Sequence, residues 1–212
     1  MRSKAAGIVV LIGLCAVLAA GQTGGDKAAL MDPAKLTEKA PETFKANFDT
    51  SIGTFVIEVH RAWDPSGADR FYNLVKNGFY DECRFFRVVP NFMVQFGISG
   101  DPNLSAKWMA ARIKDEPVKE GNKRGYVSFA KPQAPNARTT QIFINFQDNS
   151  QSLDTQGFSA FGRVTTGMNV VDKIYSGDGQ NPNQGLIQSQ GNAYLAKSFP
   201  KLDFVKKATL AP

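Results

Sequence analysis

The stretch FFRVVPNFMVQFG, residues 85–97, puts one arginine and one glutamine among aromatic, aliphatic and sulfur-containing side chains. Two short apolar runs, 85–89 and 93–96, flank Pro90-Asn91, a pair that favours a turn. Taken alone, this stretch predicts a hydrophobic β-hairpin that exposes one arginine, Arg87. Whether Arg87 has a functional role depends on the other residues that the fold places beside it.

Three segments further along the chain belong with this stretch. They read VSFA at 127–130, TTQIFI at 139–144, and LD at 153–154 followed by GF at 157–158 and FGRV at 161–164. With residues 85–97 they make four motifs, which together span most of the chain from Thr43 to Leu210. One such motif is weak evidence of resemblance to a known family, whereas four motifs in that family's order are strong evidence.

The four motifs resemble the signature of the cyclophilin-type peptidyl-prolyl cis–trans isomerases, whose first motif usually reads F-H-R-[IV]-[IV]-P-x-F-M-x-Q-x-G. The resemblance implies a mainly β fold, an eight-stranded antiparallel closed β-barrel capped by two α-helices. It also implies an enzyme that accelerates rotation about Xaa-Pro peptide bonds and uses neither cofactor nor metal. The expected partners are proline-containing polypeptides that are unfolded or that expose a loop.

The resemblance also assigns roles to residues at matching positions. Arg87 corresponds to the catalytic arginine, and Gln95 would hold the substrate backbone and position Arg87. Phe92 is grouped with Arg87 and Gln95 as catalytic and would also line the proline pocket. The substrate-binding residues would be Met93, Phe143 and Leu153 around the proline, Ala130 and Gln141 along the peptide groove, and Phe158 where many members carry a histidine. Considered singly, each of Met93, Phe143 and Leu153 fits a hydrophobic core better than a pocket, but their joint match to the motif positions favours the pocket.

An arginine suits this reaction because the chemistry is a bond rotation. The barrier of roughly 18–20 kcal/mol comes from amide resonance, and twisting the bond localises the lone pair on the proline nitrogen. A guanidinium donor near that nitrogen stabilises the twisted state more than the planar one, which is what catalysis requires. No proton shuttle or nucleophile is needed.

Three positions depart from the family pattern. Phe86 replaces the histidine that commonly precedes the arginine, and Lys131 follows Ala130 where many members have asparagine. Ser152 stands where cyclosporin-sensitive eukaryotic members have tryptophan. We therefore expect activity to survive and cyclosporin to bind weakly.

Other chemistries find little support in the sequence. His60 is the single histidine, which removes His-based triads and multi-histidine metal sites. A peptide-binding or chaperone module with little turnover, on the same scaffold, stays open. A nucleic-acid-binding barrel is disfavoured by the predicted signal segment at the amino terminus, by the modest net charge that would remain after its cleavage, and by the lack of an interleaved basic and aromatic motif.

The amino-terminal residues differ from the rest. Arg2 and Lys4 precede an uncharged apolar run, 5–20, that ends in small residues. This pattern predicts a secretory signal peptide over 1–21, and so an exported, periplasmic or secreted protein without stable membrane insertion. An uncleaved membrane anchor is the alternative. Cleavage would lower the net charge by two.

The remaining chain divides into a linker or N-terminal extension over 22–42 and one domain over 43–212, which we expect to be monomeric. Cys83 would be the single cysteine after cleavage and is expected to be buried and inert. The 16 phenylalanines favour a β-rich core.

Alternation of apolar and polar residues predicts a hairpin from 44–48 and 55–59. Asp64-Pro65 predicts the start of a helix that ends at Gly78, with Ala68, Phe71, Tyr72 and Val75 on its buried face. A second helix is expected over 167–175. Further elements are expected as strands at 126–130, 141–145, 160–164 and 204–210 and as a helical turn at 193–197.

Overall fold

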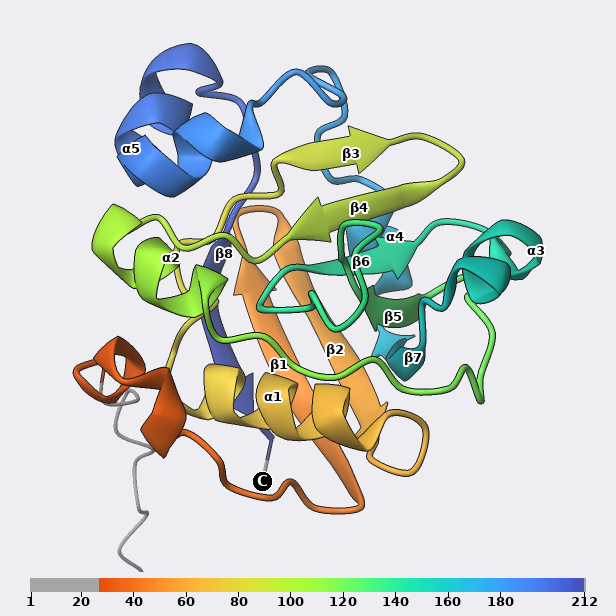
Figure 1. Cartoon of the computed structure of the whole chain (residues 1–212). Coiled ribbons are helices and arrows are strands. Elements are labelled where there is room, and N and C mark those ends of the chain that lie inside the picture. Colours follow the sequence, from red (N-terminus) through yellow and green to blue (C-terminus); the bar gives the residue numbers. More distant parts are fainter. Residues whose placement is uncertain (1–26, 212) are drawn as a thin grey trace, which may run out of the picture.

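The computed structural model describes residues 27–211, and its body is one eight-stranded antiparallel sheet (Figure 1). The strands pair in the order β3-β4-β6-β5-β7-β2-β1-β8. Their bounds are β1 (Thr43–Thr50), β2 (Gly53–His60), β3 (Arg87–Val89), β4 (Met93–Phe96), β5 (Tyr126–Phe129), β6 (Ile142–Asn145), β7 (Ala160–Thr166) and β8 (Val205–Leu210). The mainly β, antiparallel character predicted from the sequence is thereby confirmed.

The expected closed barrel is wrong, because the sheet is curled but open, with β3 and β8 as its end strands. The segments before these two strands meet in an isolated bridge between Arg84 and Phe204, which backbone hydrogen bonds from Glu82 to Val205 and from Phe85 to Asp203 flank. Beyond that bridge the two strands separate, since the backbone N–H of Val88 in β3 donates to Gly179 in a loop, at 3.0 Å. That loop takes the place that a ladder between β3 and β8 would need.

The predicted hairpin is the longest regular pairing of the sheet. β1 and β2 pair from Thr43–His60 at one end to Thr50–Gly53 at the turn. Phe48 and Phe55 face each other across this pair and stack, with ring centroids 5.1 Å apart. Both side chains are fully buried and stand at the centre of the largest hydrophobic cluster.

Helix α1 (Pro65–Lys76) begins and ends close to the predicted positions. Asp64 caps its first turn by accepting the N–H of Gly67 at 2.8 Å, and Pro65 occupies the first helical position. The helix buries Phe71 and Leu74 in the core and leaves Tyr72 half-buried. It covers the sheet beside β1 and β2 (Figure 1).

The prediction of two helices is also wrong, because residues 27–211 contain further α-helices. They are α2 (Pro102–Met109), α3 (Ser150–Leu153), α4 (Met168–Val171) and α5 (Gln184–Ser198). The second expected helix shrinks to α4, whereas the expected turn at 193–197 belongs to the longer α5. Helices α2 and α5 pack against each other.

A kink at Gly191 lets α5 pack against the start of α2. Gly191 has φ +61°, and a Cβ there would come within 2.0 Å of the carbonyl oxygen of Gly100. That same oxygen accepts the N–H of Asn192 at 3.0 Å. Only glycine combines this backbone conformation with so close an approach.

The described part of the predicted linker, residues 27–42, packs on the domain. Leu30 is fully buried, and its carbonyl oxygen accepts the indole N–H of Trp108 at 2.9 Å. The N–H of Ala40 donates to Asp69 of α1 at 2.9 Å. The predicted signal peptide, 1–21, and residues 22–26 lie outside the described residues.

Candidate active site

A groove of about 500 Å³ opens on the outer surface of the sheet, over β3, β4 and β6. All nine residues that the sequence singled out line it: Arg87, Phe92, Met93, Gln95, Ala130, Gln141, Phe143, Leu153 and Phe158. They come from four separate sequence motifs, and the pairing of β4 with β6 brings two of those motifs together.

The apolar part of the groove is a hydrophobic cluster of its own. Met93, Phe143 and Leu153 form its buried base and belong to neither of the other two clusters of the described residues. Phe92 and Phe158 are half-buried and pack against this base. The ring of Phe158 meets that of Phe143 edge-on, with centroids 5.7 Å apart. The three buried residues therefore line a pocket in place of filling the main core.

A chain of side-chain hydrogen bonds crosses the strands beside this pocket. Arg87 and Gln95 are direct partners in the β3–β4 pair, and Arg87 Nη1 donates to Gln95 Oε1 at 3.1 Å. Gln95 Nε2 donates in turn to Gln141 Oε1 at 2.8 Å. Because Gln95 is buried, this chain fixes the half-buried guanidinium against the apolar cluster.

A second amide holds the same guanidinium from the opposite side. Arg87 Nε donates to Gln180 Oε1 at 2.9 Å. The loop that carries Gln180 is attached to β3 by the hydrogen bond between Val88 and Gly179. With Nε and Nη1 engaged, Nη2 makes no hydrogen bond within residues 27–211. Burial lowers the pKa of Arg87, yet an arginine remains protonated in a protein.

The structure gives a local reason for one departure from the family pattern. Phe86 points away from the groove into a second hydrophobic cluster that includes Ile98 and Ile187. Ile187 belongs to α5. The aromatic side chain at position 86 thus supports α5, while Arg87, the next residue, faces the groove.

Sequence reasoning missed the far half of the groove. It is lined by Met109, Arg112, Lys131, Pro132, Ala137, Thr139, Gln184 and Gln188. Met109 belongs to α2, which was not expected, and Gln188 belongs to the part of α5 that precedes the expected turn. One signal was available, since Asp101-Pro102 starts α2 with a capping aspartate and a proline at the first helical position, as Asp64-Pro65 starts α1.

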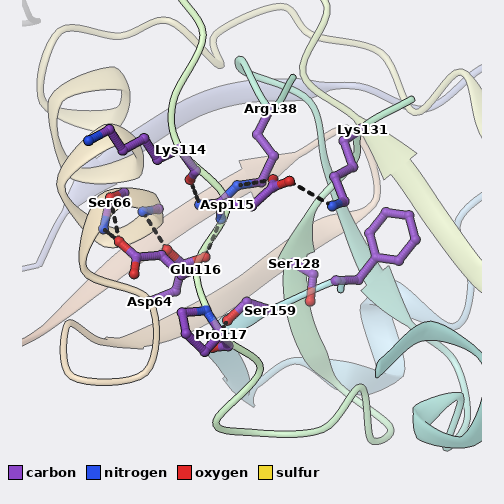
Figure 2. Close-up of polar contacts among 12 residues, drawn as sticks. Asp64, Ser66, Lys114, Asp115, Glu116, Pro117, Ser128, Lys131, Arg138 and Ser159 are labelled. Atoms are coloured by element: carbon purple, nitrogen blue, oxygen red, sulfur yellow. Dashed lines mark hydrogen bonds and ion pairs between the residues drawn. The ribbon is translucent and has the colours of Figure 1, made fainter. Parts of the chain in front are cut away.

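A partly buried chain of charges runs from Asp64, at the start of α1, to Lys131, which lines the groove (Figure 2). The carboxylate of Asp64 is fully buried and pairs with Arg138, which is 1% exposed. Arg138 Nε lies 3.5 Å from Asp115 Oδ1, and Lys131 Nζ lies 3.0 Å from Asp115 Oδ2. Lys131 is therefore held at the groove wall by groups that do not line the groove.

The two carboxyls of this chain respond differently to their surroundings. Burial raises the pKa of Asp64, and its pairing with Arg138 offsets only part of that effect. Burial would also raise the pKa of Asp115, but the N–H of Asn136 and the ammonium of Lys131 outweigh it and hold the pKa below its ordinary value. Asp115 thus stays ionised at neutral pH and keeps Lys131 in place.

Two features of the described residues bear on other classes of site. Residues 27–211 contain no group of three or more His, Cys, Asp or Glu side chains placed to hold a metal ion. Within the same range no helix has both the length and the hydrophobicity to cross a bilayer. Cys83 is fully buried, as expected, and burial raises the pKa of its thiol.

Comparison with known proteins agrees with this fold. Residues 45–190 match the model of the family "Cyclophilin type peptidyl-prolyl cis-trans isomerase/CLD". A peptidyl-prolyl cis-trans isomerase of Acinetobacter baylyi is 40% identical over 129 residues, covering 59% of this chain and 68% of the relative. Peptidyl-prolyl cis-trans isomerase B of Escherichia coli is 36% identical over 135 residues, covering 60% of this chain and 81% of the relative.

The fold has solved counterparts. A cyclophilin type peptidyl-prolyl cis-trans isomerase of Cryptosporidium parvum superposes with a TM-score of 0.59 at 19% identity, covering 80% of this chain and 98% of the other. The chain belongs to the family of cyclophilin-type peptidyl-prolyl cis–trans isomerases, on the strength of the family match and the sequence relatives.

Proposed function

We propose that this isomerase acts on Xaa-Pro bonds of exported polypeptides and thereby assists their folding, with the groove as its active site. The observation that carries the proposal is the guanidinium of Arg87, fixed by two amides at the edge of an apolar pocket. The same protein of Cryptosporidium parvum was also solved in the presence of the dipeptide Ala-Pro. The substrates proposed here are unfolded or loop-exposed segments, and the protein acts as a monomer.

The pocket and the guanidinium divide the task between them. Phe92, Met93, Phe143 and Leu153 would receive the pyrrolidine ring, with Phe158 closing one side. A ring in this pocket displaces water, which strengthens the electrostatic contact between the guanidinium and the proline nitrogen. The free Nη2 of Arg87 is the donor that would face that nitrogen as the bond twists.

The polar residues would hold the peptide backbone. Gln95 keeps the guanidinium in one orientation, so little reorganisation is needed when the bond rotates. Ala130 and Gln141 lie along the groove beside it, where an extended peptide would pass. Rotation needs no general acid or base, and the groove lining contains no carboxylate, histidine or cysteine.

The direct test is an isomerisation assay on short Xaa-Pro peptides, with the chain lacking residues 1–21. Turnover that depends on Arg87 supports the proposal. A folded protein that binds proline peptides without accelerating their isomerisation would favour the alternative, a peptide-binding module. A peptide-binding module would use the same groove, so binding alone cannot distinguish it from an isomerase. Turnover is the measurement that separates the two functions.

Export follows from the predicted signal peptide and stays a proposal. We expect the protein in the periplasmic or secreted fraction, with an amino terminus generated by cleavage near Gly21. Fractionation followed by amino-terminal sequencing tests this. Recovery of the intact amino terminus in the membrane fraction would support the uncleaved anchor.

We also expect weak inhibition by cyclosporin. Ser152 is exposed, and its hydroxyl donates to the carbonyl oxygen of Asn149 in its own helical turn at 3.2 Å. Its short side chain offers the inhibitor neither the area nor the N–H of an indole. Inhibition of peptide turnover should require micromolar or higher concentrations, and nanomolar inhibition would contradict the expectation.

A further inference from the structure

The far half of the groove carries a strong bias in charge. The lining of the whole groove includes three cations, Arg87, Arg112 and Lys131, and no Asp or Glu. Arg112 and Lys131 lie in the far half, where the other polar side chains, such as Thr139, Gln184 and Gln188, are neutral. A groove wall of this kind attracts negative charge and repels positive charge.

Local backbone pairing explains why Arg112 faces the groove. Ile113 and Arg138 form an isolated antiparallel bridge, in which the N–H of Ile113 donates to the carbonyl oxygen of Arg138 at 2.9 Å. Arg138 turns its side chain into the buried charge chain. Its neighbour Thr139 therefore points the other way, since side chains alternate along an extended segment. Arg112, next to Ile113, lies across from Thr139, and both line the groove.

The two cations differ in how far their charge is already neutralised. Lys131 forms an ion pair with Asp115, and its side chain is only 10% exposed. The chain of Asp115, Arg138 and Asp64 shown in Figure 2 anchors that pair from behind the groove. Arg112 is exposed, and its guanidinium has no carboxylate partner within residues 27–211. The positive charge of Arg112 is thus the one available to pair with a carboxylate of a bound peptide.

We propose that this half of the groove selects substrates with an acidic residue near the proline, and that Arg112 recognises that carboxylate. The inference rests on the proposed function of the groove and adds a substrate class to it. The occupant is an extended peptide whose Xaa-Pro bond lies beside Arg87 and whose Asp or Glu lies beside Arg112. Lys131 adds to the positive charge of the groove wall, although its ion pair with Asp115 is neutral overall. Arg112 makes the direct contact with the substrate carboxylate.

The test uses proline peptides that carry Glu, Gln or Lys at each position within three residues of the proline. Catalysed exchange, measured by NMR, gives kcat/KM for each peptide, and fluorescence anisotropy of labelled peptides gives the dissociation constant. At the position that faces Arg112, we expect Glu to exceed Lys by about two- to fivefold in kcat/KM, the range of an exposed ion pair. The difference should shrink in 0.5 M salt.

Two charge reversals locate the effect. Arg112→Glu is expected to abolish or invert the preference for Glu over Lys. Lys107→Glu makes the same change in net charge on the exposed surface of α2, outside the groove, and should leave the preference in place. An equal loss of preference in both variants would assign it to the overall field of the protein and overturn the proposal.

The outcomes separate this inference from the function on which it rests. Normal turnover of the Gln peptides with equal values for Glu and Lys at every position would overturn the inference alone. Absence of turnover for all peptides would overturn the isomerase function in this groove. In that case the binding constants still decide the inference, because a Glu-to-Lys ratio of one in binding would overturn it as well.

Discussion

Replacing Arg87 with alanine is expected to lower kcat/KM for a neutral Xaa-Pro peptide about a hundred- to a thousandfold, the usual loss when one preoriented donor to a transition state is removed. The guanidinium lies at the edge of the apolar pocket, held through Nε by Gln180 and through Nη1 by Gln95. Its donor is therefore fixed before substrate arrives. Alanine leaves the pocket intact but removes the charge that we propose meets the nitrogen lone pair.

Two further variants make this experiment decisive. Arg87→Lys keeps the positive charge but loses the fork of donors that Gln95 and Gln180 grip, so most of the activity should still be lost. Lys206→Ala removes an exposed cation on β8, away from the groove, and should keep wild-type activity. Near-normal turnover by a folded Arg87→Ala protein would show that the proposed mechanism is wrong.

Replacing Asp64 with alanine is expected to cost about 3–5 kcal/mol in the free energy of unfolding, the typical loss when one partner of a buried ion pair is removed. Arg138 would be left with an uncompensated charge in a site where it is 1% exposed. The same substitution removes the side-chain oxygen that caps α1 through the N–H of Gly67. Both effects act on folding, at a distance from the groove.

Urea unfolding at equilibrium measures the loss in the free energy of unfolding caused by Asp64→Ala. Two other variants serve as controls. Asp172→Ala breaks an exposed pair with Arg124 and should cost less than about 1 kcal/mol. Replacing Asp64 and Arg138 together by leucine and methionine should be milder than Asp64→Ala, because no buried charge is then stranded. A loss below 1 kcal/mol for Asp64→Ala would contradict the account of the buried chain.

Much of the local structure was predictable because its causes are local. The hairpin of β1 and β2 follows from alternation around a short turn, and α1 follows from a capping aspartate with proline at the first position. The nine predicted site residues all line one groove because the four motifs that carry them fold into neighbouring strands and the loops beside them. Their catalytic and binding roles remain predictions.

The features that could not be predicted from the sequence depend on contacts between distant parts of the chain. Alternation within β3 or β8 cannot show whether the two strands meet, since that depends on where Gly179 docks. Arg138 also has no local sign of burial, because its partner Asp64 stands 74 residues earlier. Helix α5 was underestimated because Gly191 interrupts its pattern, and the reason for that glycine lies in Gly100.

The open sheet carries a further consequence for the behaviour of the protein at high concentration. Free strand edges invite pairing with other chains and so promote aggregation. Here the outer side of β3 is occupied by Gly179, and β8 is met by the segment before β3, where Val205 accepts the N–H of Glu82 at 2.7 Å. Exposed Lys206 and Lys207 lie on β8 itself. The molecule thus covers part of both margins of its sheet without forming a ladder between β3 and β8.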